Sequence, residues 1–392
     1  MQKTKKILIL STSYLPMVGG SEIAIKEITD RLSEIEFDLV TSHFLKNTLS
    51  EEKMGNINVF RVGGGLGLFN FLLPKNFLPI AVFKKARELI KNRGPYDLVH
   101  IFQASQAGGA VWLLKFFYPK LKILLTLQEG QDLEKQNFLK RFFRSLIIKK
   151  INRATAISEY LKKYMLGIRK DLPVYVAPNG VDMDVFLKDF SYGELSDLAE
   201  KLEIKPGEKI IITTGRLVYK NGVDTLIKAM AILAKHPDNK FKLLIIGEGE
   251  QKNELLSLAE KLGLKSKVVF AGSVENRELP KYLKIAHIFV RPSRSEGLGN
   301  SFLEAMAAGI PIIGPAVGGI VDFLKDGQTG LICDQNNPED IAKKIELIME
   351  DENLRKKLVS NAKLLVEQKY NWDKIAQDYQ NQYDIINSNS SL

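Results

Sequence analysis

The chain of 392 residues is 45% hydrophobic and 26% charged, with a net charge of +10. This composition excludes a fully disordered or collagen-like chain, and the length favours two domains. The longest apolar stretch, residues 66–83, contains prolines, a lysine and asparagines, and the apolar run near the N-terminus spans only residues 7–10, so we expect neither a membrane-spanning helix nor a signal peptide and predict a cytoplasmic protein.

Strand-like apolar runs alternate with segments of helical period, which predicts an α/β fold with parallel sheets. We expect a first series of strands at residues 6–10, 37–41, 59–62, 98–101, 123–127, 154–157 and 174–176. After a polar stretch with Pro206-Gly207, a second series is expected at residues 210–213, 242–246, 268–271, 288–290, 311–314 and 330–333. We therefore predict two doubly wound domains, residues 1–200 and 201–371, facing across a cleft in which ligands bind at the carboxyl ends of the strands.

A glycine pair, Gly19 and Gly20, lies between the first predicted strand and a helix that opens at Ser21-Glu22. Glycines in this position let backbone N–H groups approach an anion, and the helix dipole adds to the attraction. A plain glycine turn is the alternative interpretation, because the sequence is neither GxGxxG nor a Walker motif.

The excess positive charge lies in the first half, with a net charge of +11 over residues 1–190 and −1 over residues 191–392. Within it, residues 138–153 carry apolar side chains at helical spacing, six bases and no acid. The apolar members are Phe138, Leu139, Phe142, Phe143, Leu146, Ile147 and Ile151, and the bases are Lys140, Arg141, Arg144, Lys149, Lys150 and Arg153. The pattern fits a helix on an anionic membrane surface, and it fits equally a core-facing stripe with solvated bases. Nucleic acid is not expected as a partner, because no recognition motif accompanies the charge.

Two loops of the second half carry candidate anion-binding residues. Arg216 and Lys220 follow the strand at 210–213, where they can clamp a diphosphate and stabilise it as a leaving group; solvated surface bases are the alternative. After the strand at 288–290, N–H groups near Asn300 and Ser301 can face a phosphate, and Glu296 can accept hydrogen bonds from sugar hydroxyls. Ser301 and Glu304 also fit an S-x-x-E capping box, which leaves Glu304 as either a cap or a ligand.

No metal site is expected. The single cysteine, Cys333, lies in an apolar run and is predicted to be a core residue, and the four histidines are scattered. Asp182 and Asp184 form a D-x-D pair, which we interpret as part of a turn because two carboxylates alone hold a divalent cation poorly.

Taken together, motifs along nearly the whole chain resemble the family-four retaining glycosyltransferases of the GT-B fold, also called glycosyl transferases group 1. The matching stretches are Gly19-Gly20-Ser21-Glu22, Ser158-Glu159-Tyr160-Leu161, Pro178-Asn179-Gly180-Val181-Asp182, Gly215-Arg216-Leu217, Gly247-Glu248-Gly249, Gly318-Gly319, the E-x7-E pair Glu296 and Glu304 with the following Ala305-Met306-Ala307-Ala308-Gly309, and Tyr370-Asn371-Trp372. The resemblance implies that a last helix, at about residues 372–388, packs back on the N-terminal domain.

The resemblance also implies a role for each site residue. Gly19 and Gly20 approach the donor phosphates, Arg216 with a nearby lysine binds the diphosphate, and Glu304 holds the nucleotide ribose. Glu296 and the backbone of Gly297, Leu298, Gly299, Asn300 and Ser301 contact the donor sugar and distal phosphate. Backbone near Val274 reads the base, and no metal or other cofactor is implied.

Two positions depart from the family pattern. The family lysine directly precedes the glycine, whereas here Asn221 precedes Gly222 and Lys220 stands one residue earlier. Gln128 stands where relatives often have a histidine that contacts the sugar, and an amide cannot shuttle a proton. In the front-face mechanism proposed for such enzymes the departing phosphate takes the acceptor's proton, so activity is still expected. For His100, in an H-x-H-like stretch, packing and function are both open.

These features predict a metal-independent, retaining hexosyltransferase that uses a nucleotide diphosphate sugar, UDP-linked in our interpretation. The acceptor is a glycan, a lipid-linked molecule or a small molecule. We expect loops of the N-terminal domain, especially residues 63–83, to recognise it, but they carry no specific motif that identifies it. A cytoplasmic protein, peripheral on the inner face of the cell membrane, is expected. The alternatives are a GT-B nucleotide-sugar epimerase or phosphorylase, and a catalytically silent nucleotide-sugar-binding protein, which Gln128 and Asn221 suggest.

Overall fold

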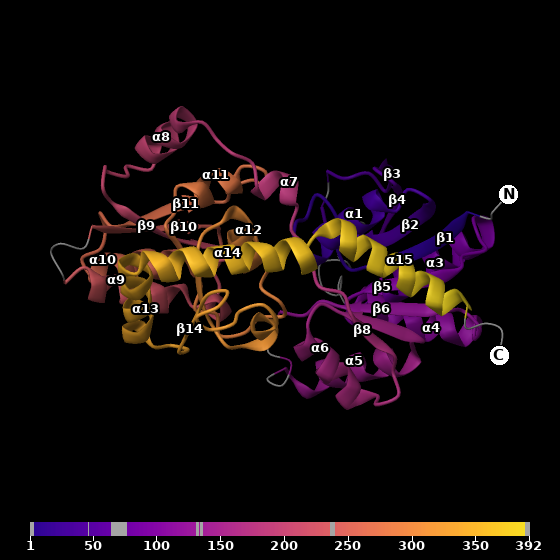
Figure 1. Ribbon diagram of the computed structural model, residues 1–392. Coiled ribbons are helices and arrows are strands. Elements are labelled where there is room, and N and C mark those ends of the chain that lie inside the picture. Colours follow the sequence, from indigo (N-terminus) through magenta and orange to yellow (C-terminus); the bar gives the residue numbers. More distant parts are fainter. Residues whose placement is uncertain are drawn as a thin grey trace. The chain divides into compact units, whose positions relative to one another are not determined.

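The computed structural model describes residues 4–45, 47–63, 77–130, 133, 136–235 and 240–388. The chain forms two compact units, Met1–Asn179 with Trp372–Leu392, and Gly180–Asn371. Each unit is built on its own sheet with helices packed against it (Figure 1). Most of the loop expected to recognise the acceptor, residues 63–83, lies outside the described residues.

The sheet of the first unit has the order β3-β4-β2-β1-β5-β6-β7-β8. Its strands are β1 (Lys5–Ser11), β2 (Ile35–Ser42), β3 (Glu51–Met54), β4 (Ile57–Val62), β5 (Leu98–Phe102), β6 (Ile123–Leu127), β7 (Arg153–Ala156) and β8 (Val174–Val176). All seven predicted strands are present, and pairings such as Ile7 with Phe37 and with Leu98 are parallel. The sequence did not predict β3, an antiparallel edge strand on β4, because its residues Glu-Glu-Lys-Met form no apolar run.

The helices of this unit are α1 (Gly20–Arg31), α3 (Leu78–Asn92), α4 (Ala110–Phe117), α5 (Phe138–Lys150), α6 (Glu159–Ile168) and the C-terminal α15 (Trp372–Ser388), with a short 3-10 turn η1 (Ala107–Gly109). Helix α15, yellow in Figure 1, contacts α1 and places Trp372, Tyr379 and Tyr383 in the core of the first unit. The chain's last helix therefore completes the fold of its first domain.

His100 belongs to a buried polar network that joins α15 to the sheet. Its Nδ1 lies 2.9 Å from the Tyr383 hydroxyl and its Nε2 lies 2.7 Å from Thr126 Oγ1. Thr126 in turn contacts Thr155 and Tyr379. Burial lowers the pKa of His100 to about 3, so this histidine is a neutral packing residue.

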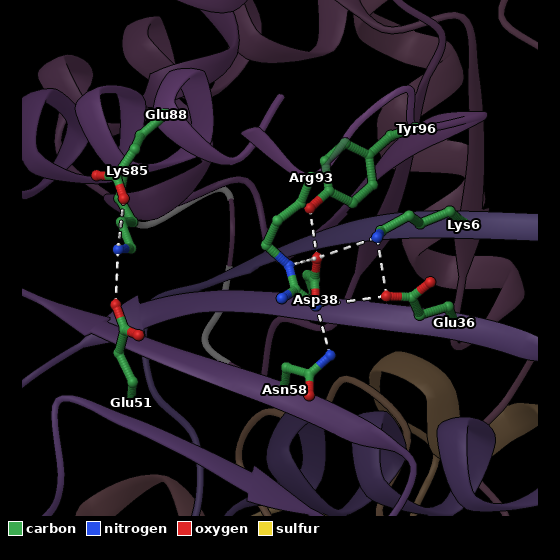
Figure 2. Close-up of polar contacts among 9 residues, drawn as sticks. All are labelled: Lys6, Glu36, Asp38, Glu51, Asn58, Lys85, Glu88, Arg93 and Tyr96. Carbon is green, nitrogen blue, oxygen red and sulfur yellow. Dashed lines mark hydrogen bonds and ion pairs between the residues drawn. The ribbon is translucent and has the colours of Figure 1, made fainter. Parts of the chain in front are cut away.

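A second polar cluster ties α3 to the sheet (Figure 2). Asp38 on β2 is fully buried and accepts hydrogen bonds from Arg93 at the end of α3, from Tyr96 and from Asn58 on β4. These bonds hold the pKa of Asp38 below its usual range against the opposing effect of burial. The cluster is fully paired, so it is part of the scaffold rather than a site.

The second unit has a six-stranded parallel sheet of order β11-β10-β9-β12-β13-β14. Its strands are β9 (Lys209–Thr214), β10 (Phe241–Ile246), β11 (Val268–Gly272), β12 (Ile288–Val290), β13 (Ile312–Pro315) and β14 (Leu331–Cys333), as predicted to within one residue. Its helices are α7 (Met183–Phe186), α8 (Tyr192–Lys201), α9 (Val223–Leu233), α10 (Lys252–Lys261), α11 (Leu279–Lys284), α12 (Asn300–Ala308), α13 (Pro338–Glu350) and α14 (Glu352–Lys369), with 3-10 turns η2 (Tyr219–Asn221) and η3 (Gly318–Asp322). This strand order is that of a doubly wound nucleotide-binding fold.

The division between the units lies at Gly180, before the predicted boundary at residue 201. The segment after β8 turns to the second unit, because Val181 pairs with Asn371, α7 packs on α12 and α8 packs on α11. The predicted boundary rested on the polar Pro206-Gly207 turn, which lies inside the second unit. Polarity marks a loop there and not a change of unit.

The structure also bears on the predictions for Cys333, for Asp182 and for membrane-spanning helices. Cys333 is buried, and burial raises the pKa of its thiol to about 12. Asp182 caps α7, accepting a hydrogen bond of 3.2 Å from Val185 N. Among the described residues, no helix is long and apolar enough to cross a membrane.

Candidate active site

The site of the second unit lies at the point where its strand order reverses. Strands β9 and β12 are neighbours in the sheet although β10 and β11 intervene in the chain. At their carboxyl ends, residues 213–217, Asn221 and Arg291 line a small crevice, at the place where doubly wound sheets bind ligands. Arg216 and Lys220 stand in the loop after β9, and Glu296 and Ser301 follow β12.

Two glycines, Gly222 in the loop after β9 and Gly318 in the loop after β13, allow close approach to the loop after β12. Gly222 has φ +69°, and a Cβ at this position would collide with the carbonyl of Pro292 in the β12 loop. Gly318 has φ +52°, and a Cβ there would collide with the carbonyl of Glu296. A side chain at either position would push the backbone of the site apart.

Arg291 is the centre of the polar network in this crevice. It directly follows β12, and its guanidinium donates to Asn221 Oδ1 at 2.7 Å and Ser301 Oγ at 2.5 Å. It also forms an ion pair of 2.6 Å with Glu296. A buried arginine thus joins the β9 loop, the β12 loop and the first turn of α12.

Glu296 is surrounded by cations. Besides Arg291, Lys220 Nζ lies 3.6 Å from its carboxylate, and Ser293 Oγ donates at 3.2 Å. Burial, together with the nearby Arg291 and Arg216, lowers the pKa of Lys220, and Glu296 opposes this shift. Three bases and one carboxylate give the cluster a positive balance.

Arg216 is the exposed member of the cluster. It follows the Gly215 turn after β9, and among the described residues no carboxylate pairs with it. Its backbone carbonyl accepts a 2.6 Å hydrogen bond from Asn221 Nδ2, so Asn221 connects the two arginines. An open guanidinium at the end of a switch-point strand is suited to an anionic ligand.

Helix α12 contributes its N-terminus and Glu304. The helix is capped by Gly299, and no side chain caps it, so the capping-box interpretation of Ser301 and Glu304 is wrong. Ser301 is instead bonded to Arg291. Burial raises the pKa of Glu304 to about 7, and the charge of Arg291 opposes the shift. Gly297, Leu298 and Gly299 form the buried turn before the helix.

The other predicted site residues lie elsewhere. Val274 follows β11 at the edge of the sheet, two strands from β9. In the first unit, Gly19 caps α1 with extended backbone and Gly20 is its first residue, both after β1. Gln128 follows β6, where its Oε1 accepts a 3.3 Å hydrogen bond from Asn179 and its buried Nε2 has no partner among the described residues.

Arg291 and Asn221 were not predicted as functional residues. Asn221 was noted only as a departure from the family lysine, and Arg291, directly after the strand at 288–290, was given no role. The signal that identifies Arg291 is a charged residue directly after the fully buried strand Ile288–Val290, because such a residue lies at the ligand-binding edge of the sheet.

The two doubly wound units match the architecture of the GT-B fold. Among solved structures, sucrose-phosphate synthase from Thermosynechococcus elongatus aligns with a TM-score of 0.83 and 20% identity over 98% of this chain and 100% of that chain. The Anabaena protein HepE in complex with UDP and glucose aligns with a TM-score of 0.78 and 20% identity over 97% of this chain and 99% of that chain.

Sequence comparisons assign the family. Residues 196–365 match the model for glycosyl transferases group 1, and residues 18–185 match that for glycosyltransferase family 4. An uncharacterised glycosyltransferase of Methanocaldococcus jannaschii is 30% identical over 97% of this chain and 98% of the relative. N-acetyl-alpha-D-glucosaminyl L-malate synthase of Bacillus anthracis is 26% identical over 97% of this chain and 98% of the relative. The chain belongs to the family-4 glycosyltransferases, which confirms the resemblance to that family and to the GT-B fold.

Proposed function

We propose that this glycosyltransferase moves a hexose from a UDP-linked donor to an acceptor, with retention of the anomeric configuration and without a metal ion. The observation that carries the proposal is the cation cluster of Arg216, Lys220 and Arg291 at the switch point of the second unit. Fixed cations can balance the charge that a departing nucleoside diphosphate acquires. UDP as the nucleotide is supported by the likeness of fold to HepE, whose structure contains UDP.

Each group has a proposed role in this reaction. Arg216, Lys220 and the N-terminus of α12 bind the diphosphate, and Arg291 holds Glu296 and Ser301 in position around it. Glu304 accepts hydrogen bonds from the ribose hydroxyls, and Glu296 accepts from the donor sugar. Backbone near Val274 reads the base. In the first unit, the family resemblance assigns contacts with the donor to the backbone of Gly19 and Gly20 and to the side-chain amide of Gln128.

The proposed chemistry is a front-face displacement. The bond between the anomeric carbon and the phosphate oxygen breaks, and the acceptor oxygen bonds to the same face of that carbon. The departing phosphate takes the acceptor's proton, so no side chain has to act as a base. The protein's contribution is orientation of the two substrates and stabilisation of charge on the diphosphate.

A donor screen followed by product analysis tests the proposal. Native mass spectrometry with UDP-, GDP- and ADP-sugars identifies the donor, and NMR of the product formed in EDTA reports its anomeric configuration. We expect a UDP-sugar to bind in the mass-spectrometric screen. We also expect an α-linked donor to give an α-linked product. An inverted product would contradict retention, and donor binding without turnover across a broad acceptor panel would favour a silent binding protein.

A carboxamide substitution tests the role of Glu296. Glu296→Gln should lower kcat/KM about tenfold to a hundredfold, the loss expected for one charge-assisted hydrogen bond. Glu254→Gln, on the exposed side of α10, is the matched control and should leave turnover unchanged. Full turnover of Glu296→Gln would remove this residue from the site.

A further inference from the structure

We infer that the outer face of α4 and α5 in the first unit is a docking surface for an anionic lipid membrane. This surface, called the α4–α5 face below, consists of large apolar side chains that are between 45% and 80% exposed. They are Trp112, Phe116, Phe117, Phe138, Leu139, Phe142 and Phe143. The two helices are in contact with each other, and Phe117 also stacks on Phe83 of α3 at a ring-centroid distance of 5.5 Å.

Helix α5 turns these apolar residues outward and not into the core. Its buried side is made by Arg144, Ile147 and Ile148, whereas Phe138, Leu139, Phe142 and Phe143 are exposed. The single apolar stripe expected over residues 138–153 is therefore wrong, because the aromatic half and the isoleucine half of the helix face opposite directions. A soluble surface rarely carries so many exposed aromatic residues without a binding function.

The aromatic rings of the face support one another. Phe138 and Phe142 have ring centroids 6.2 Å apart, and Phe116 and Phe117 have ring centroids 5.2 Å apart. Lys150 Nζ on α5 lies 5.5 Å from the centre of the Trp112 ring on α4, which joins the two helices at the surface. Ring contacts thus order neighbouring side chains within each helix, and the contact of Lys150 with Trp112 links the two helices.

The charge of helix α5 indicates that the partner of the α4–α5 face is anionic. Lys140, Arg141, Lys149 and Lys150 on α5 are exposed, and in the described part of the chain none of them pairs with a carboxylate. Of the six bases seen in the sequence, Arg144 is instead buried in an ion pair with Glu129, and Arg153 bonds Gln382. Four unpaired bases beside exposed aromatic rings suit lipid phosphates next to acyl chains. A second copy of the same face would bring bases against bases, which disfavours self-association through it.

Co-sedimentation with vesicles tests the inference on the full chain. The wild type should bind vesicles of phosphatidylcholine mixed with phosphatidylglycerol, bind pure phosphatidylcholine far less, and lose binding as salt shortens the range of charge attraction. Lys149→Ala/Lys150→Ala should lower the partition coefficient about thirtyfold. Phe138→Ser/Phe142→Ser should lower it comparably without affecting attraction at long range.

The control is Lys363→Ala/Leu364→Ser, which changes an exposed base and an exposed leucine on α14 of the second unit and should bind vesicles like the wild type. Thermal unfolding of each variant confirms that it is folded. No sedimentation of the wild type with anionic vesicles at low salt would overturn the inference. So would equal binding by the aromatic and control variants, or a dimer in light scattering that Phe138→Ser/Phe142→Ser converts to a monomer.

Discussion

At the residue scale, Arg291, directly after β12, adds a buried cation that the sequence prediction did not include. The family pattern places a lysine where this chain has Asn221, and the sequence pointed to Lys220 as its replacement. In the structure, Asn221 directs its amide oxygen to Arg291, which stands in the same crevice from the neighbouring strand. Lys220 and Arg291 both lie close to the Glu296 carboxylate, at 3.6 Å and 2.6 Å respectively, so Arg291 makes the shorter ion pair.

Replacing Arg291 should therefore impair the reaction, because its guanidinium contacts Asn221, Ser301 and Glu296. Arg291→Met should lower kcat/KM by about 10² to 10³, the usual cost of one lost electrostatic stabiliser. Arg291→Lys should not restore it, because a point charge cannot reproduce the guanidinium's simultaneous bonds to Asn221, Ser301 and Glu296. Steady-state kinetics check this, with the exposed Arg277→Met as control. A kcat/KM for Arg291→Met within twofold of the wild type would make Arg291 a packing residue only.

The raised pKa of Glu304 gives a pH signature for donor binding. With a pKa of about 7, the carboxyl group of the free protein is mostly protonated at pH 6 and mostly ionised at pH 8. The ionised form accepts stronger hydrogen bonds from ribose hydroxyls, so a UDP-sugar should bind about tenfold more tightly at pH 8 than at pH 6. Calorimetric titration of wild type and Glu304→Gln at both pH values isolates this effect. The same pH dependence in both proteins would exclude Glu304 as its source.

At the scale of elements, α15 depends on buried polar contacts as well as on apolar packing. His100 has a pKa of about 3 when folded and about 6.5 when unfolded. Below pH 6.5 the unfolded chain takes up a proton that the folded protein does not, so His100 makes the free energy of unfolding fall as the pH drops. The slope reaches about 1.4 kcal/mol per pH unit.

His100→Gln should remove this dependence. At pH 7.5 the variant should be less stable by about 1 to 3 kcal/mol, because Tyr383 or Thr126 loses a buried partner. At pH 5.0 the deficit should shrink by about 2 kcal/mol, since the variant has no proton to gain on unfolding. Urea unfolding at the two pH values measures both quantities. A deficit that is independent of pH would mean that His100 is not neutral in the folded protein.

The elements themselves were largely predictable from the sequence, and the exceptions have physical reasons. Buried parallel strands are continuous apolar runs, so all but β3 were found. Helix α5 shows the limit of periodicity, because helical spacing identifies apolar faces without saying which of them is buried. The exposed aromatic half of α5 required the structure.

At the scale of the molecule, the first unit is built from two segments that are far apart in the sequence, Met1–Asn179 and Trp372–Leu392. The return of the last helix to the first unit was implied by the family motif Tyr370-Asn371-Trp372. The side chains that fix it there, such as Trp372, Tyr379 and Tyr383, lie far along the chain from the strands they cover. A local reading of the sequence does not contain such contacts.

Removing α15 should therefore damage the first unit selectively. A chain that ends at Asn371 loses core side chains of the first unit and exposes the apolar surface they covered. We expect calorimetry to show one unfolding transition lost or strongly lowered, and the second unit to retain UDP binding. Loss of both transitions together would show that the units unfold as one.

The sequence predicted which residue types line the candidate site, but it did not predict the contacts between the loops that carry them. Glu296, Arg216 and Lys220 were identified by motif and spacing, and the structure brings Lys220 and Glu296 together in one crevice. Arg291 and Asn221 act through contacts between loops about 70 residues apart in the chain, which no local pattern reports.

In the proposed function, fixed cations of the second unit bind the diphosphate of the donor. Calorimetric titration of the protein with UDP and with uridine, both in EDTA, tests it most directly. UDP should bind at least about a hundredfold more tightly than uridine, as two or more charge-assisted hydrogen bonds require, and Arg216→Ala should remove most of that difference. Equal affinities for UDP and uridine, or UDP binding that appears only when a divalent metal is added, would contradict the account.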